Sequence, residues 1–148
     1  MRIIATVISI LALAACANLS RPSAGGIERS QSLGHGFWII TIAENIQGGF
    51  EAIKHSGYCY YRSYNVGLCN RMSPSPSGTF AIYQQTDTGL VMLYDTRSSQ
   101  SLQLTESFPG LLGPATWQEQ RRIVQFNAGG RGSVQSYTFD FSGVDGGT

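Results

Sequence analysis

The stretch GTFAIYQQTDTGLVMLYD, residues 78–95, gives the clearest indication of the fold. Two short runs rich in apolar and aromatic residues, 79–85 and 90–95, flank the segment TDTG. Thr, Asp and Gly are typical of tight turns, because Asp bonds the local backbone and Gly accepts a positive φ. A pair of such runs around such a turn predicts a β-hairpin.

Further short strands are predicted on both sides of this hairpin. Residues 37–42, FWIITI, form the continuous apolar run of a strand covered on both faces. Residues 50–54 and 58–63 indicate two strands separated by a turn at Ser56 and Gly57. After the hairpin, SLQLT, RIVQF and VQSYTFDF add strands, the last two joined by NAGGRGS. We therefore expect an all-β fold of about eight to ten short strands: a single small antiparallel sandwich, barrel or propeller-blade-like meander.

Residues 75–126 carry a more particular pattern. SPSG at 75–78 opens a strand, a hairpin ends at Asp95, and Trp117 precedes the next strand. The pattern resembles one blade of a TolB-type β-propeller, and the resemblance implies a four-stranded antiparallel meander. A propeller needs several blades, for which this chain is too short, so no propeller function is carried over.

The composition excludes some classes of partner. Charged residues make up only 13% of the 148-residue chain, against about 25% in typical soluble proteins. Lys54 is the single lysine, so the chain has no basic patch that would neutralise nucleic-acid phosphates. We expect no nucleic-acid partner.

The N-terminus has the pattern of an export signal. Met1 and Arg2 precede an apolar run over residues 3–15, which is shorter than the roughly 20 residues of a transmembrane helix. The run ends in Leu13-Ala14-Ala15-Cys16, which resembles the lipobox of bacterial lipoproteins. The resemblance implies that residues 1–15 are removed as a signal peptide. It also implies that Cys16 carries diacylglyceryl and palmitate chains that enter the lipid bilayer.

The same resemblance implies a location. Residue 17 is Ala, not the Asp that retains many lipoproteins at the inner membrane, so we expect the outer membrane with the domain facing the periplasm. Residues 16–32 are rich in Ser, Gly, Ala and Arg and are predicted to form a flexible tether. We expect one β domain over residues 33–141 and a disordered tail over 142–148.

Two cysteines remain once Cys16 is assigned to lipid. In an exported chain, Cys59 and Cys69 most simply form a structural disulfide that closes an eleven-residue loop. A redox pair would normally have the closer Cys-x-x-Cys spacing, and no metal-ligand spacing is present.

The loop between these cysteines is rich in tyrosine. Tyr58, Tyr60, Tyr61, Arg62 and Tyr64 lie in or beside it. On a strand, Tyr58 and Tyr60 share one face, while Tyr61 shares the other with Cys59. Because Tyr and Arg are enriched at interface hot spots, this hairpin is our candidate partner-binding surface. The alternative is that one of its faces packs in the core.

The sequence gives no catalytic or metal-binding assignment. It has only two histidines, His35 and His55, both in turn-like contexts, and neither a Gly-x-Ser-x-Gly nor a His-Glu-x-x-His motif. We expect no cofactor and no enzymatic activity. The leading hypothesis is a lipid-anchored module that binds a periplasmic or envelope protein, as an inhibitor or immunity protein does. An accessory subunit of an envelope assembly or secretion complex is the alternative, and a small hydrolase is a weaker one.

Overall fold

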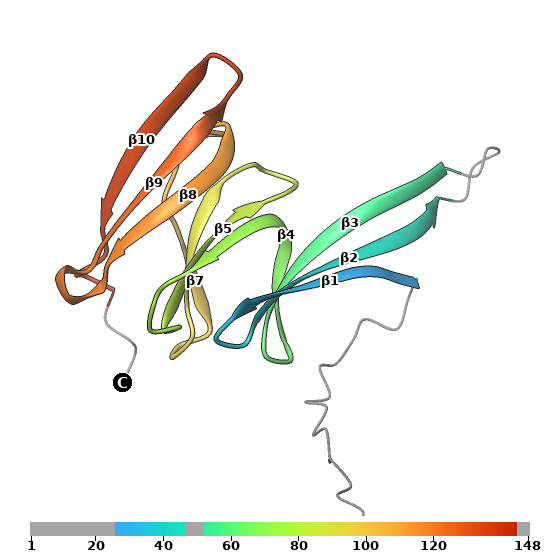
Figure 1. The fold of residues 1–148 in the computed structure, drawn as a ribbon, viewed down its shortest axis with the longest axis horizontal. Helices are drawn as coiled ribbons and strands as arrows, with labels where there is room; N and C mark the ends of the chain where they lie inside the picture. The colour runs from blue at the N-terminus through green and yellow to red at the C-terminus, as the bar shows by residue number, and fades with distance from the viewer. Residues whose placement is uncertain (1–25, 47–51, 145–148) are drawn as a thin grey trace, which may run out of the picture.

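The computed structural model describes residues 26–46 and 52–144 (Figure 1). In that part of the chain the fold is all-β, as predicted, with one turn of 3-10 helix, η1 (Glu119–Arg121), and no α-helix. A seven-stranded and a three-stranded sheet are both antiparallel, and neither closes on itself. The first contains β1 (Gly26–Gly34), β2 (Phe37–Ile46), β3 (Ala52–Tyr61), β4 (Tyr64–Pro74), β5 (Phe80–Gln85), β6 (Val91–Asp95) and β7 (Gln100–Gln103), and the second contains β8 (Leu111–Gln118), β9 (Ile123–Gly130) and β10 (Ser133–Asp140).

The β5–β6 hairpin is the centre of the molecule, and its two strands match the predicted runs. Both of its faces are buried. Since side chains alternate along a strand, one face contributes residues such as Ile82 and Leu93 to the core shared with the three-stranded sheet. The other face contributes residues such as Tyr83 and Tyr94 to a second core shared with β2, β3 and β4. Most positions of the two strands are apolar, as expected for a hairpin that is covered on both sides.

Strand β4 turns the first sheet into two layers. Its first half pairs with β3, and its second half, from Cys69 onward, pairs with β5. Both ladders contain a register shift near this point, and such irregularities bend a strand and increase its twist. Strands β1–β3 therefore lie on one side of β5 and β6, and strands β8–β10 lie on the other (Figure 1).

One predicted turn is wrong. Ser56 and Gly57 lie inside the continuous strand β3, where they pair with Ile42 and Thr41 of β2. Gly57 has a packing role: a Cβ at this position would overlap the carbonyl oxygen of Cys69. The glycine that suggested a turn instead allows β4 to cross close to β3.

The ordered domain also extends beyond the predicted limits at both ends. Strand β1 pairs with β2 from Gly26 onward, so residues 26–32 are not part of a tether. Its described side chains are mostly exposed, which explains why the sequence shows no apolar periodicity there. At the other end, Val144 donates its backbone N–H to Phe141 O at 3.0 Å and packs against the core. The predicted signal peptide, Cys16 and residues 145–148 lie outside the described residues.

The segment that resembles a propeller blade divides between the two sheets. Strands β5, β6 and β7 continue the first sheet, whereas β8 and β9 belong to the second. The predicted meander therefore does not run through the whole of residues 75–126.

Among the described residues, no helix has the length and apolar character needed to cross a membrane.

Candidate functional site

The candidate site lies at the turn between β3 and β4. Arg62 and Ser63 form this turn, and Arg62 has a left-handed backbone with φ of 55°. Its backbone N–H donates a 2.6 Å hydrogen bond to the carbonyl oxygen of Gly36, in the turn between β1 and β2. The β3–β4 turn is therefore fixed against a neighbouring turn.

Tyr64 is the most exposed aromatic residue of this turn. The residue is 50% exposed, although its ring stacks on that of Tyr94 with 6.1 Å between centroids and 17° between planes. Tyr94 is only 1% exposed and belongs to the core under the β5–β6 hairpin. Burial raises the pKa of Tyr94. The ring of Tyr64 therefore rests on a buried core residue.

Tyr61 links the turn to the core. Its ring lies 4.9 Å from that of Phe37 and 6.1 Å from that of Tyr94. The guanidinium carbon of Arg62 lies 5.3 Å from the centroid of the Tyr61 ring, a cation–π distance. Arg62 itself is exposed, so its charge faces solvent while its position is restrained by Tyr61 and by its backbone hydrogen bond.

Strand alternation divides the five residues that the sequence assigned to partner binding. Tyr60 is 3% exposed and packs with Ile40 and Ile42, and Tyr58 is half-buried against the same group. Burial, and to a lesser extent the neighbouring phenol of Tyr58, raises the pKa of Tyr60. Both tyrosines therefore serve packing, while Tyr61, Arg62 and Tyr64 are brought together at the turn.

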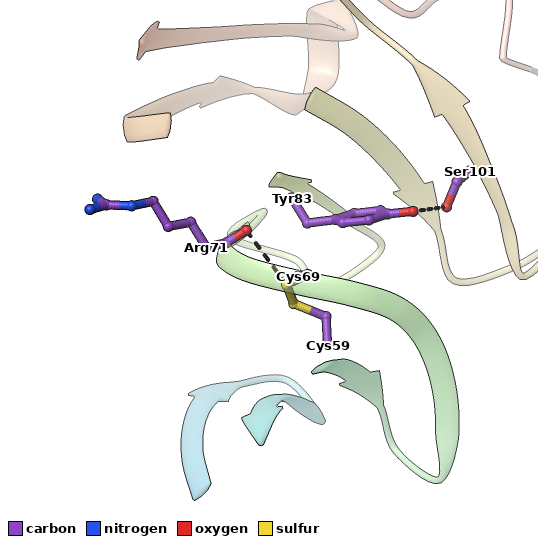
Figure 2. Close-up of a disulfide and its surroundings, with 5 residues drawn as sticks. All are labelled: Cys59, Cys69, Arg71, Tyr83 and Ser101. Carbon is purple, nitrogen blue, oxygen red and sulfur yellow. Dashed lines mark hydrogen bonds between the residues drawn. A yellow bond between two sulfur atoms is a disulfide. The ribbon is translucent and has the colours of Figure 1, made fainter. Parts of the chain in front are cut away.

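The disulfide forms the base of this turn. Cys59 and Cys69 are joined as predicted, with their Cα atoms 5.4 Å apart and both residues 0% exposed (Figure 2). The pair lies where β4 changes its partner from β3 to β5. In the adjoining layer, Tyr83 Oη donates a 2.9 Å hydrogen bond to Ser101 Oγ. A covalent link and a packed core together fix the direction in which the turn projects.

His35 is an exposed neighbour of this site that the sequence did not suggest. It lies in the β1–β2 turn with φ of 52°, beside Gly36, and its side chain packs against the position where Gly78 has no Cβ. The two glycines flanking it in Gly-His-Gly were the available signal, since they indicate a constrained turn. We name the group formed by His35, Tyr61, Arg62 and Tyr64 the tip surface.

Glu119 of η1 joins the loop before β5 to the second sheet, close to this region. Its carboxylate accepts hydrogen bonds from the backbone N–H of Ser77, at 3.0 Å, and from the Ser77 hydroxyl. Burial raises the pKa of Glu119, but the hydrogen bonds from Ser77 and Ser75 and the charge of His35 outweigh it, so the net pKa is lowered. The arrangement is a serine–carboxylate contact that ties two loops together.

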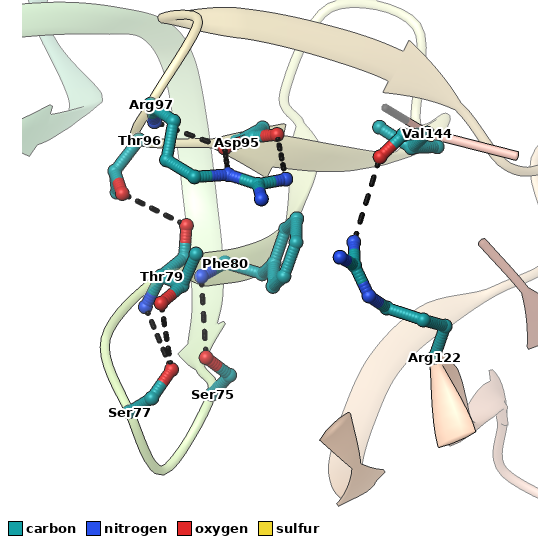
Figure 3. Close-up of polar contacts among 9 residues, drawn as sticks. All are labelled: Ser75, Ser77, Thr79, Phe80, Asp95, Thr96, Arg97, Arg122 and Val144. Carbon is teal, nitrogen blue, oxygen red and sulfur yellow. Dashed lines mark hydrogen bonds and ion pairs between the residues drawn. The ribbon is translucent and has the colours of Figure 1, made fainter. Parts of the chain in front are cut away.

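A second charged group lies between the sheets (Figure 3). Asp95, whose side chain is 3% exposed, accepts hydrogen bonds from the backbone and guanidinium of Arg97 at 2.7–3.0 Å. The guanidinium carbons of Arg97 and Arg122 lie 5.0 and 5.5 Å from the ring centroid of Phe80. Arg122 also reaches the carbonyl oxygen of Val144 at 3.5 Å. Both carboxylate oxygens of Asp95 accept hydrogen bonds from Arg97, so we assign this group a structural role.

The structure does not bring the two histidines together. His35 lies in the turn between β1 and β2. His55 lies on β3, where it pairs with Ala43, six residues before Tyr61 and so roughly 20 Å from Tyr61 along the strand. In the described part of the chain, no three His, Cys, Asp or Glu residues are placed to hold a metal ion.

Comparison of the chain with protein-family models, with curated proteins and with solved structures gives no match.

Proposed function

We propose that this chain is a bacterial outer-membrane lipoprotein whose β domain binds a periplasmic or envelope protein through the tip surface. The observation that carries the proposal is the stacking of half-exposed Tyr64 on buried Tyr94. An exposed aromatic ring held from below loses little conformational freedom when a partner covers it, and so retains more of its contact energy.

Arg62 adds the second element of a binding surface. Tyr and Arg are over-represented among residues that dominate binding energy, and such residues cluster at the centres of interfaces. Arg62 and Tyr64 are both exposed, and the turn that carries them is restrained by the disulfide and by the hydrogen bond to Gly36. A prearranged surface of this kind suits a tight inhibitor-like interaction with one partner.

The lipid anchor rests on the lipobox-like sequence that ends at Cys16. Two or three acyl chains, at about 0.8 kcal/mol for each buried methylene, hold a protein at a bilayer essentially permanently. Substituting Cys16→Ser in the full chain should abolish incorporation of labelled palmitate and leave the unprocessed precursor. Equal labelling of wild type and variant would contradict the anchor.

The binding proposal is tested by crosslinking in the intact envelope. A photoreactive residue replaces Asn65, which is exposed beside Tyr64, in the wild-type background and in Arg62→Ala/Tyr64→Ala. We expect one dominant crosslinked protein in the wild type and at least about a tenfold loss in the double variant. The control is Arg121→Ala/Phe108→Ala, which removes another exposed arginine and another exposed aromatic residue.

Thermal melting of the purified variants shows that each one folds. Crosslinking that survives Arg62→Ala/Tyr64→Ala unchanged would exclude the tip surface. Migration of the wild type with a large membrane complex, without a discrete crosslinked partner, would favour the accessory-subunit alternative over an inhibitor.

A further inference from the structure

Four strands lie at the edges of the two sheets in the described residues: β1 and β7 in the first, β8 and β10 in the second. The outer edge of a strand presents unpaired backbone N–H and C=O groups, which attract another strand. Native proteins normally protect such edges with short strands, charges, prolines or bulges. The four edges of this domain differ clearly in that respect.

Three of these edges carry a protective feature. Strand β7 has only four residues. Strand β8 contains Pro114 and a register shift between Leu112 and Ala115. Strand β1 contains two register shifts and the charged residues Glu28 and Arg29.

Strand β10 is longer than β7, has no proline and no register shift, and carries a single charge at its end. Its eight residues, SVQSYTFD, pair with β9 in an unbroken register and include no proline, glycine or lysine. The only charge is Asp140 at its end, and Val134 is 68% exposed. The strand lies at the outer side of the molecule, with β9 between it and β8 (Figure 1). A long, regular, almost uncharged edge of this kind is a template for strand addition.

The turn before β10 determines which backbone groups face outward. Arg131 and Gly132 form a two-residue connection, so the flanking residues Ser133 and Gly130 are a hydrogen-bonded pair. Hydrogen-bonded and non-hydrogen-bonded pairs alternate along an antiparallel ladder. The odd-numbered residues of β10 therefore bond to β9, and the outward-facing groups belong to the even-numbered residues, Val134, Ser136, Thr138 and Asp140.

We propose that β10 pairs antiparallel with β10 of a second copy of this chain, with Ser136 on the twofold axis. The two three-stranded sheets then form one continuous six-stranded sheet. Ser136 faces Ser136 of the second copy, and Val134 faces Thr138, so the even-numbered residues supply every hydrogen bond. Such an interface uses the same surface on both copies, the commonest arrangement of homodimers.

Charge favours this register over the one with Tyr137 on the axis. Asp140 of one copy lies opposite Gly132 of the other, and therefore beside the exposed Arg131. The neighbouring register, with Tyr137 on the axis, would put Asp140 opposite Val134 and away from any cation of β10 or its turn. The strand thus carries its own complementary charge, which favours a second copy over an unrelated strand.

The dimer should be weak and reversible. One pair of eight-residue strands is a small interface, below the roughly 1,200 Å² of standard complexes, and we expect a dissociation constant on the order of 10–100 μM. This surface is separate from the tip surface, so the dimer and the proposed function can fail independently.

Cysteine crosslinking tests the register. Ser136→Cys places two thiols opposite each other across the axis, at the roughly 5.5 Å Cα separation of a hydrogen-bonded pair, which a disulfide can span. Gln125→Cys is the matched control, because Gln125 is exposed on β9, opposite Thr138 and one strand away from the edge. Under mild oxidation, full-length Ser136→Cys should form a covalent dimer, and Gln125→Cys and the wild type should not. Equal dimer yields from the two cysteine variants would overturn the proposal.

Sedimentation equilibrium of the full chain, with its acyl chains held in detergent micelles, gives a second readout. The wild type should show a dimer at protein concentrations up to about 300 μM. Ser136→Pro removes an outward-facing N–H and should weaken association at least about tenfold, while its melting curve reports on the monomer fold. Arg131→Asp should weaken association about threefold to tenfold through its two symmetry-related ion pairs. A wild type that stays monomeric at this concentration would overturn the proposal.

Discussion

The side-chain oxygen of Gln84 accepts a 3.0 Å hydrogen bond from the backbone N–H of Leu112, and so joins the central hairpin to the second sheet. The amide nitrogen of Gln84 donates to the carbonyl oxygens of Gly89, at 3.0 Å, and Gly110, at 2.7 Å. Gln84 is only 1% exposed. This buried polar side chain thus satisfies the buried N–H of Leu112 and two partly buried carbonyl groups.

Gln84→Leu should destabilise the domain by about 3 kcal/mol. Leucine has a similar volume, but it removes a hydrogen bond from the buried N–H of Leu112 and from two partly buried carbonyl groups. A buried group left unpaired costs roughly 1–3 kcal/mol. Urea denaturation measures the change. Gln125→Leu is the control, since Gln125 is exposed, and it should alter stability by less than about 0.5 kcal/mol. Equal effects of the two substitutions would exclude the bridging role of Gln84.

Gly57→Ala should destabilise the domain by about 1–3 kcal/mol, because its Cβ would overlap the carbonyl oxygen of Cys69 and push β3 from β4. Gly130→Ala provides a matched comparison on another strand. A Cβ at Gly130 meets no atom within 4 Å, so this change should be neutral or slightly stabilising. Thermal melting of the two variants measures the difference. A Gly57→Ala variant as stable as Gly130→Ala would show that β3 and β4 can separate without cost.

The disulfide should resist reduction until the domain unfolds. Cys59 and Cys69 are both 0% exposed, so a thiol reagent cannot reach either sulfur in the native state. Thiol release should be slow in buffer and fast in denaturant. Cys59→Ala/Cys69→Ala should lower the free energy of unfolding by about 3 kcal/mol, as expected for closing a loop of this length. Rapid thiol release from the native protein would contradict the burial of Cys59 and Cys69.

Acid should weaken the fold partly through Asp95. Burial raises the pKa of Asp95, but the hydrogen bonds and charge of Arg97, with the charge of Arg122, outweigh it and lower the pKa below its ordinary value of 3.8. A carboxyl group whose pKa is lower in the folded than in the unfolded protein stabilises the folded protein at any pH above the unfolded pKa. This contribution is lost as the pH falls through the pKa of the folded protein.

Arg97→Ala tests this contribution. Because the buried carboxylate of Asp95 loses a bidentate hydrogen-bond partner, we expect the free energy of unfolding at pH 7 to fall by about 1–3 kcal/mol. The variant should also lose less stability than the wild type between pH 5 and about pH 2, since the pKa of its Asp95 is less depressed. Urea denaturation across this range gives both values. Arg121→Ala, which removes an exposed arginine of η1, should behave like the wild type in its pH dependence.

The sequence predicted the central hairpin well because its apolar runs and turn residues are local signals. It predicted the Ser56-Gly57 turn wrongly because the same residues that form turns also permit close strand crossings. Gly57 permits such a crossing, because a Cβ at this position would overlap the carbonyl oxygen of Cys69. Strand β1 was missed because its described side chains are mostly exposed, and its place in the sheet depends on backbone pairing, to which side-chain periodicity gives no clue.

The candidate site was only partly predictable. Alternation along β3 correctly separates Tyr58 and Tyr60 from Tyr61. Which face is buried depends on the layers that cover it, and these come from segments far apart in the chain. The contribution of His35 depends likewise on a contact between two hairpin turns, made through the Arg62 to Gly36 hydrogen bond.

The sequence by itself determined that the chain is all-β, where its central hairpin lies, and which two cysteines pair, because these follow from alternation, turn chemistry and composition within short segments. Only the tertiary structure decided that β4 is shared between two layers, that Tyr64 is exposed on a buried support while Tyr60 is not, and that β10 is left as an unprotected edge. These features depend on which strands become neighbours, and that choice is made by packing across the whole domain.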